Sequence, residues 1–368
     1  TRTALPILSV LTGSDMRSAI ENSGLLAKAR AVSGRHYRSL AGVALGMLAW
    51  MGLWVGAIWG QLGSPHPDNA WVKGAYEVKA KAVARIQDHH KALLVGGSAT
   101  MFGVDSALLS EGLGLPVANA GVNAGLGAYV VPREVDRFIA AGDIVVMPLE
   151  YRLLLWDGVP SYVTLSWALE HPETLRYWRI TSLLNGLWSL PFARVQQGYG
   201  DSAFDAESWS RAGPYGPHKL SKFGDQVDTA AKQRTRSQWE AIESLAPERY
   251  DELYADTTLG LDEWAFWWER WQQRGACLVV VPPPFMKVAV YESTQYREFF
   301  DQIPKRVERR GVTYLGHPSD AFFTVEGMFD TNYHLTAESR RIYTEWLLET
   351  LLSSNVKCLA THQGAGTL

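Results

Sequence analysis

The longest apolar pattern of the chain lies near its start. No Asp, Glu, Lys or Arg occurs from Ser39 to Pro67, and residues 40–62 are largely apolar. As a helix, such a stretch spans about 34 Å, which is enough to cross the hydrocarbon core of a bilayer. A core helix of this length normally has a polar face, and a cleaved signal peptide normally has a shorter apolar region. We therefore expect an uncleaved transmembrane anchor over residues 40–62.

Charge predicts the orientation of this anchor. Residues 1–40 contain six Lys or Arg and two Asp or Glu, so their net charge is +4, and the other 328 residues carry −7 of the total of −3. Arg30, Arg35 and Arg38 directly precede the apolar stretch. The positive-inside rule then places residues 1–39 in the cytoplasm and the bulk of the chain outside.

Beyond the anchor, short apolar runs alternate with amphipathic segments, which predicts a parallel sheet covered by helices. Residues 63–90 are expected to form a linker and a helix, and residues 91–352 an α/β domain. The expected strands are 92–95, 116–120, 143–149, 276–281 and 312–315. The expected helices are 78–90, 104–112, 129–141, 261–274, 295–310 and 335–352. Residues 353–368 are expected to be a flexible tail.

The alternation of strands and helices lapses over residues 151–260, which predicts a mainly helical insertion in the domain. Ten of the 15 tryptophans lie between Trp156 and Trp271. Their rings could stack on sugars. Trp264, Trp267, Trp268 and Trp271 are spaced as one face of a helix, however, and are expected to be core.

Composition narrows the functional classes. The negative net charge and the absence of a basic stripe argue against nucleic acid as a partner. Two cysteines, Cys277 and Cys358, give neither a disulfide framework nor a metal-ligand spacing, and Cys277 is expected to be a small core residue. No metal or tightly bound cofactor is implied.

A serine follows the first expected strand of the domain. Leu93-Leu94-Val95 is an apolar run that ends at Gly96-Gly97-Ser98. Because ligands of parallel sheets collect at the carboxyl ends of the strands, Ser98 is a candidate nucleophile. The residue two positions after it is Thr100, so the Gly-x-Ser-x-Gly elbow of α/β-hydrolases does not apply.

Two further segments contain candidates for the base, its orienting acid and the oxyanion donors that a serine nucleophile needs. Asp330 and His334 precede the last expected helix; His334 could accept the Ser98 proton while Asp330 fixes its tautomer. Helix capping by Asp330 and a surface position for His334 are the alternative. Gly121 and Asn123 follow the second expected strand and could donate hydrogen bonds to an oxyanion, or form only a glycine-rich turn.

This combination resembles the SGNH hydrolase-like superfamily. It looks most like the membrane-anchored members that act beside membrane-bound O-acyltransferases on bacterial exopolysaccharides and cell-wall polymers. The resemblance covers residues 91–150 and 276–352, with the anchor, and its blocks are Gly97-Ser98, Asn119-Ala120-Gly121 and Phe329 to Leu335. Two departures occur: three residues rather than two separate Asp330 from His334, and Leu149-Glu150-Tyr151 stands where the Gly-x-Asn-Asp block is usual.

The resemblance implies a three-layer αβα fold of the flavodoxin-like type. It also implies an O-acyltransferase, acetyl most of all, facing the periplasm from the bacterial inner membrane. Ser98 would be acylated, His334 would act as base and then acid, and Gly121, the Ser98 amide and Asn123 would hold the oxyanion. A polysaccharide would be the acceptor, and a multi-pass membrane-bound O-acyltransferase the partner. A carbohydrate esterase with the same triad and a non-catalytic assembly subunit remain alternatives.

Three more residues are weighed as substrate contacts. Glu150 and Tyr151 follow the third expected strand, and His218 belongs to a polar, aromatic stretch over residues 215–224. A capping or solvated carboxylate is an equal alternative for Glu150, and a surface loop is the alternative for the stretch that holds His218.

Overall fold

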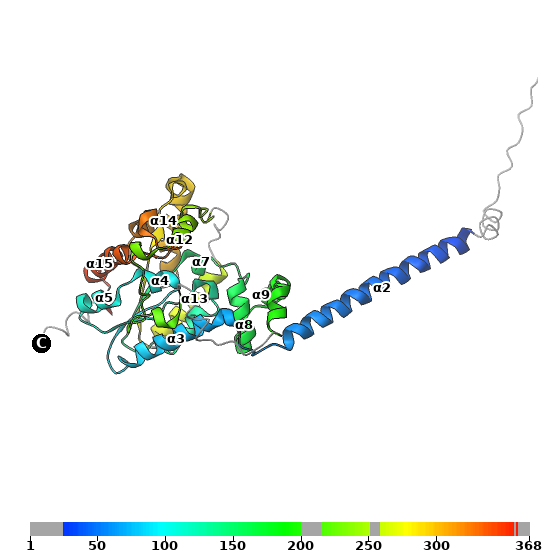
Figure 1. Cartoon of the computed structure of the whole chain (residues 1–368), viewed down its shortest axis with the longest axis horizontal. Helices are drawn as coiled ribbons and strands as arrows, with labels where there is room; N and C mark the ends of the chain where they lie inside the picture. The colour runs from blue at the N-terminus through cyan, green and yellow to red at the C-terminus, as the bar shows by residue number, and fades with distance from the viewer. Residues whose placement is uncertain (1–24, 200–214, 251–257, 357, 360–368) are drawn as a thin grey trace, which may run out of the picture. The chain divides into compact units, whose positions relative to one another are not determined.

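The computed structural model describes residues 25–199, 215–250, 258–356 and 358–359, so residues 1–24 of the expected cytoplasmic segment 1–39 lie outside them. The chain divides into two compact units at Gly60 and Gln61. The first unit contains one long helix, α2 (Leu25–Trp59). Within it, His36–Trp59 is long and apolar enough to cross a membrane (Figure 1), so its length and composition agree with the expected single span.

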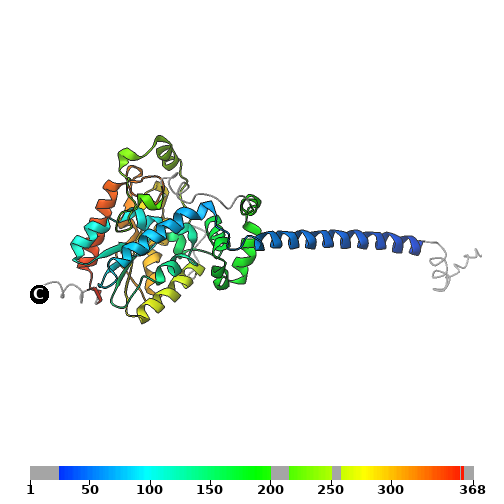
Figure 2. The ribbon, with the colours of Figure 1, turned by 60° about the horizontal axis from the view of Figure 1, so that its bottom comes forward.

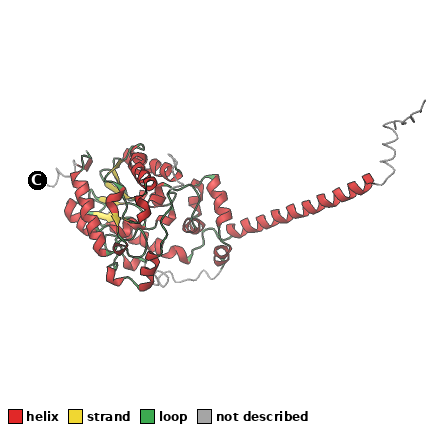
Figure 3. Cartoon of the chain, turned by 90° about the horizontal axis from the view of Figure 1, so that it is seen from above, coloured by secondary structure: helices red, strands yellow, loops and turns green. Residues whose placement is uncertain are grey.

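The second unit is built on five parallel strands. They are β1 (Ala92–Leu94), β2 (Val117–Asn119), β3 (Ile144–Pro148), β4 (Cys277–Val281) and β6 (Thr313–Tyr314). Each lies within a strand predicted from the sequence. The order β2-β1-β3-β4-β6 is the strand order of flavodoxin-like folds. Helices surround the strands (Figure 3), so the α/β class is confirmed.

The strands form here because they are continuously apolar. All residues of β1, β2, β3 and β4 are buried, as expected where helices cover both faces of a parallel sheet. Figure 2 shows helices on both sides of the sheet. Helix α5 (Ser106–Leu113) packs on α15 (Ala337–Ser353), and α6 (Val131–Asp136) packs on α13 (Leu259–Gln273).

Two predicted helices, 78–90 and 129–141, have wrong boundaries. Helix α3 is Pro67–Ala84 and therefore starts eleven residues before the predicted residue 78. Pro67 is compatible with this start because the first helical position needs no amide donor. Helix α6 starts at Val131, not at residue 129, and ends at Asp136. Pro132 is compatible with this start, because it lies in the first turn, where the helix needs no amide donor from it.

The described parts of the insertion are mainly helical, as predicted; residues 200–214 and 251–257 lie outside the description. The α-helices are α7 (Tyr151–Leu154), α8 (Tyr162–Glu170), α9 (Ile180–Ser189), α10 (Phe192–Gln197) and α12 (Arg236–Glu243). The short 3-10 turns are η2 (Pro172–Tyr177), η3 (Pro217–Lys219) and η4 (Ala231–Gln233). The four tryptophans of α13 are buried, which confirms them as core.

The remaining elements are short helices and turns, the long helix α14 and two short strands. They are α4 (Ser98–Gly103), η1 (Ala124–Leu126), β5 (Phe285–Met286), η5 (Ala289–Glu292), α14 (Thr294–Glu308), η6 (Pro318–Ala321), β7 (Phe322–Phe323) and η7 (Val325–Gly327). β5 and β7 form a separate two-stranded parallel sheet.

The cysteines correct two expectations. Cys277 at the start of β4 forms a disulfide with Cys358, 81 residues later. The chain after α15 is therefore fastened to the sheet, and Leu359 is buried against the core. The sequence could not show this pairing because nothing in two distant cysteines indicates their separation in space. The predicted flexible tail is wrong for residues 353–356 and 358–359, and the residues from 360 on lie outside the description.

Candidate active site

Ser98 lies on a sharp turn from strand to helix. It is the first residue of α4 and follows β1 by four positions. Gly97 before it is required by crowding, because a Cβ there would lie 2.4 Å from Glu150 Oε1 and 2.5 Å from the Ala124 amide nitrogen. The turn thus places the Ser98 hydroxyl at the carboxyl end of the sheet, as expected from the sequence.

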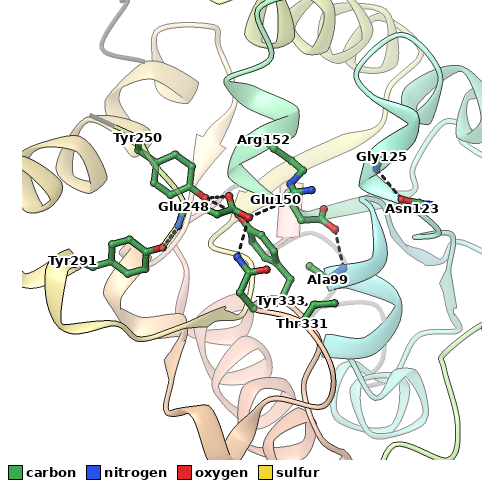
Figure 4. Close-up of polar contacts among 11 residues, drawn as sticks. Ala99, Asn123, Gly125, Glu150, Arg152, Glu248, Tyr250, Tyr291, Thr331 and Tyr333 are labelled. Atoms are coloured by element: carbon green, nitrogen blue, oxygen red, sulfur yellow. Dashed lines mark hydrogen bonds and ion pairs between the residues drawn. The ribbon is translucent and has the colours of Figure 1, made fainter. Parts of the chain in front are cut away.

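A buried carboxylate holds this turn. Glu150 accepts the Gly97 amide at 2.9 Å. It also accepts the Ala99 amide at 2.7 Å, as Figure 4 shows. Burial raises the pKa of Glu150, while the hydrogen bonds from Ala99 and Gly97 act in the opposite direction. Of the two roles weighed for Glu150, the structure shows capping: it satisfies amides that a helix start leaves without acceptors. It nevertheless lines the pocket described below.

Asp330 and His334 form a close pair. Asp330 Oδ1 lies 2.6 Å from His334 Nδ1, so three intervening residues do not prevent the contact. Asp330 Oδ2 accepts the Tyr215 hydroxyl at 2.6 Å. Burial alone would raise the pKa of Asp330, but the charge and hydrogen bond of His334 and the hydrogen bond of Tyr215 outweigh it and hold the pKa low. Asp330 therefore stays ionised and orients the imidazole.

The imidazole is held over the helix that carries the serine. The rings of His334 and Phe102 are stacked, with centroids 3.9 Å apart and planes inclined by 6°. Phe102 and Ser98 are four residues apart on α4, and side chains at this spacing share one helix face. His334 thus lies over the face that presents Ser98. Within the described residues no hydrogen bond joins the two side chains, and both line one pocket.

That pocket has a volume of about 310 Å³. Besides Ser98 and His334, it is lined by Asn123, whose Oδ1 accepts the Gly125 amide at 2.8 Å (Figure 4). This bond orients the side chain and leaves its Nδ2 as a donor. The Ser98 amide is a second donor, because the first amide of a helix has no intrahelical acceptor. Asn123 and the Ser98 amide can therefore stabilise an oxyanion.

Gly121 is placed less favourably. Its amide donates to Asn119 Oδ1 at 3.0 Å, so this predicted oxyanion donor is already engaged. A Cβ at Gly121 would lie 2.6 Å from the Gly97 carbonyl oxygen. Gly121 thus lets the turn after β2 approach the turn at Gly97–Ser98 closely. Its role in the structure is one of packing.

Two of the predicted substrate contacts do not reach the pocket. Tyr151 is fully buried and packs against Tyr250, Phe285 and Phe300. His218 is exposed on η3, which corresponds to the surface-loop alternative. Tyr215 from the same stretch does line the pocket. The sequence indicated the stretch over residues 215–224 but could not show that Tyr215 meets Asp330, because this contact joins residues 115 positions apart.

Sequence reasoning also missed a polar cluster beside the pocket. Glu248 accepts hydrogen bonds from Arg152 at 2.5 Å, from Asn332 at 2.8 Å, and from the Tyr250 hydroxyl (Figure 4). The Glu248 amide in turn donates to Tyr291 Oη at 2.7 Å. The cluster joins the insertion to the loop that holds the Asp–His pair. The only hint in the sequence was the position of Asn332 within that loop.

A second pocket, of about 410 Å³, adjoins the first. The two share Ala124, Gly125 and Arg152 as lining residues. Trp156 lines the second pocket, and its ring is fixed by a bond from Nε1 to the Val159 carbonyl oxygen at 2.6 Å. The site therefore has room for a ligand that extends beyond the residues around Ser98.

Among the described residues, no group of three or more His, Cys, Asp or Glu side chains is arranged to hold a metal ion. The chain matches no family model, no curated protein and no solved structure. The chemistry of the site is therefore inferred from its own residues and distances.

Proposed function

We propose that the protein transfers an O-acyl group, most simply acetyl, to an extracytoplasmic polysaccharide through an acyl-enzyme on Ser98. One observation carries the proposal: the buried Asp330–His334 pair, with its 2.6 Å contact, is stacked on Phe102 of the helix that begins at Ser98. A paired and oriented histidine beside a serine at a helix start is the arrangement of nucleophilic acyl transfer.

The mechanism follows from these positions. His334 Nε2 takes the hydroxyl proton of Ser98 while Oγ attacks the carbonyl carbon of the donor ester. Asn123 Nδ2 and the Ser98 amide stabilise the oxyanion, and the donor alcohol leaves with the proton from His334. In the second half, His334 removes a proton from an acceptor hydroxyl, which attacks the acyl-enzyme and frees Ser98. Asp330 keeps Nδ1 protonated throughout and stabilises the imidazolium.

The second pocket supports a large acceptor. A pocket lined by Trp156 and Arg152 offers an apolar ring and hydrogen-bond donors, the combination that suits the C–H face and hydroxyls of a sugar. Because it shares lining residues with the catalytic pocket, a bound glycan could present a hydroxyl to Ser98.

The disulfide supports a location outside the cytoplasm. Disulfides persist in oxidising compartments such as the periplasm and are rare in the cytosol. The Cys277–Cys358 bond therefore agrees with the orientation expected from Arg30, Arg35 and Arg38, which precede the apolar residues 40–62 within α2. Activated acyl donors would then need delivery across the bilayer, for which a multi-pass membrane-bound O-acyltransferase is the proposed partner.

We further propose that the second unit belongs to the SGNH hydrolase-like group. The strand order and the position of Asp330 and His334 directly before the last helix support this assignment.

The test uses the full-length protein in detergent with p-nitrophenyl acetate, with and without oligosaccharides from bacterial exopolysaccharides. Acyl transfer predicts acetylated sugar and faster nitrophenol release when an acceptor is present. Release that sugar leaves unchanged, with no acetylated product, would identify an esterase. Activity equal in Ser98→Ala and wild type would favour a non-catalytic assembly subunit.

A further inference from the structure

Helix α9 presents its large apolar side chains to the outside. Ile180, Leu184 and Trp188 are spaced four residues apart, so they form one stripe along the helix. Their exposed fractions are 75%, 52% and 72%. Exposed apolar residues that gather on one helix face, rather than scatter singly, indicate an interaction surface.

The opposite face of α9 carries its small residues. Ser182 and Gly186 are buried, and a Cβ at Gly186 would lie 2.8 Å from Leu165 Cδ2 on α8. Figure 1 shows α9 beside α8 at one edge of the unit. The helix thus packs on the protein through small residues and leaves its Leu and Trp side chains outside, which reverses the pattern of a helix on a water-exposed surface.

This edge is tied to the point where the anchor ends. Gln61 donates to the Val195 carbonyl oxygen at 3.3 Å and accepts from Arg194 at 2.9 Å, and both residues belong to α10. The Gly63 amide donates to the Leu169 carbonyl oxygen on α8 at 2.8 Å. The candidate span ends at Trp59, and two residues of chain reach at most about 7 Å. A membrane that this span crosses is therefore only a short length of chain away from Gln61 and the residues it contacts on α10.

The charges around α9 suit a lipid surface. From Thr174 to Tyr199 the sequence contains three arginines and no Asp or Glu, and the exposed Glu173 directly precedes this stretch. Arg194 is buried, so two of the three arginines can face lipid. Arg176 and Arg179, just before α9, are exposed. A Trp-bearing apolar stripe preceded by two exposed arginines resembles the composition of interfacial helices, whose apolar face enters the acyl boundary while basic residues meet lipid phosphates.

We propose that α9 is an interfacial helix: its Ile180–Leu184–Trp188 stripe lies in the outer-leaflet boundary of the membrane that the anchor crosses. The helix then sets the orientation of the second unit on the membrane. The inference rests on the anchor and is independent of the catalytic proposal.

The test places an environment-sensitive dye at Leu184→Cys in the full-length protein, reconstituted alone into vesicles with bromine-labelled acyl chains. The native cysteines are joined in the disulfide and do not take the dye. The matched control is Ile342→Cys, because Ile342 is 60% exposed on α15, on the other side of the unit from α9 (Figure 1). We expect strong quenching by the lipid bromines at position 184 and none at 342.

A second variant separates lipid contact from proximity alone. In the Leu184→Cys protein, Ile180→Asp together with Trp188→Asp should reduce quenching at 184 about tenfold, since two apolar contacts with lipid are lost. Equal quenching at 184 and 342 would overturn the proposal. A label at 184 that is shielded only after a membrane protein partner is added would also overturn it, and would assign the stripe to that partner.

Discussion

Replacing Asp330 with Asn tests the role of the Asp–His pair with almost no change of shape. Asp330 accepts two short hydrogen bonds, from His334 and from Tyr215, and its side chain is 7% exposed. An asparagine keeps one acceptor oxygen and presents an NH2 group to the other partner. If that group faces His334 Nδ1, the imidazole must carry its proton on Nε2, where it can no longer accept the proton of Ser98.

The magnitude follows from this tautomer change. In serine proteases the corresponding exchange lowers kcat about 10⁴-fold, which is about 5.4 kcal/mol of transition-state stabilisation. We expect a loss of about 10²- to 10⁴-fold here, the smaller value applying if the asparagine oxygen stays toward His334. The matched control is Tyr215→Phe, which removes one neutral partner of Asp330 and should cost about tenfold or less.

The assay is hydrolysis of p-nitrophenyl acetate by full-length protein at pH 7.5, with urea unfolding of each variant measured in parallel. Asp330→Asn within threefold of wild type would refute the reasoning. A loss in Tyr215→Phe as large as in Asp330→Asn would also contradict it, because the control leaves the Asp330–His334 contact intact.

Stability should depend on pH in a defined direction. The pKa of Asp330 is lowered in the folded protein, so its carboxylate contributes stability above its unfolded pKa, about 3.9. That contribution is lost as the pH falls through the lower folded pKa. The difference in free energy of unfolding between wild type and Asp330→Asn should therefore be largest above pH 5 and shrink below pH 4, whereas a difference that grows on acidification would contradict the shift.

Three other changes give separate readouts. Cys358→Ala should lower the free energy of unfolding by about 4.5 kcal/mol, the value for a closed loop of this length, and wild type in dithiothreitol should fall to the same level; no difference under oxidising conditions would disprove the bond. Glu150→Gln places an NH2 group against the Gly97 or Ala99 amide, which in the wild type donates to a carboxylate oxygen. Urea unfolding should therefore show a loss of about 1–3 kcal/mol in the free energy of unfolding, and activity assays should show a lower kcat. Trp156→Ala should reduce transfer to oligosaccharide about tenfold more than ester hydrolysis, and equal losses would exclude an acceptor role.

The fold was predictable where burial is continuous along the chain. Apolar runs of five residues such as Cys277–Val281 are typical of strands in a sheet covered on both faces, so the five strands of the main sheet were found. The two-residue strands β5 and β7 were not predicted. The start of α3 was missed because Gly63-Ser64-Pro65-His66-Pro67 has the composition of a linker, whereas Pro67 is in fact the first residue of the helix. The Cys277–Cys358 bond could not be predicted, since two cysteines alone do not reveal which chain ends meet.

The candidate site was predictable for the residues that directly follow strands or precede the last helix. Ser98, Asn123, Asp330 and His334 belong to short segments with recognisable order, and the structure brings all four to one region. Contacts from the insertion were not predictable. Tyr215 and the Glu248 cluster reach the site across more than 80 residues, through a region whose sequence shows no regular period.

The most direct test of the central claim is covalent capture of the acyl-enzyme. Full-length protein is mixed with p-nitrophenyl acetate, quenched in acid within seconds, digested and examined by mass spectrometry. The account predicts one added acetyl group, on Ser98, which accumulates in His334→Ala more slowly than in wild type and is absent from Ser98→Ala. Acetylation at another residue, or equal acetylation of Ser98→Ala and wild type, would contradict it.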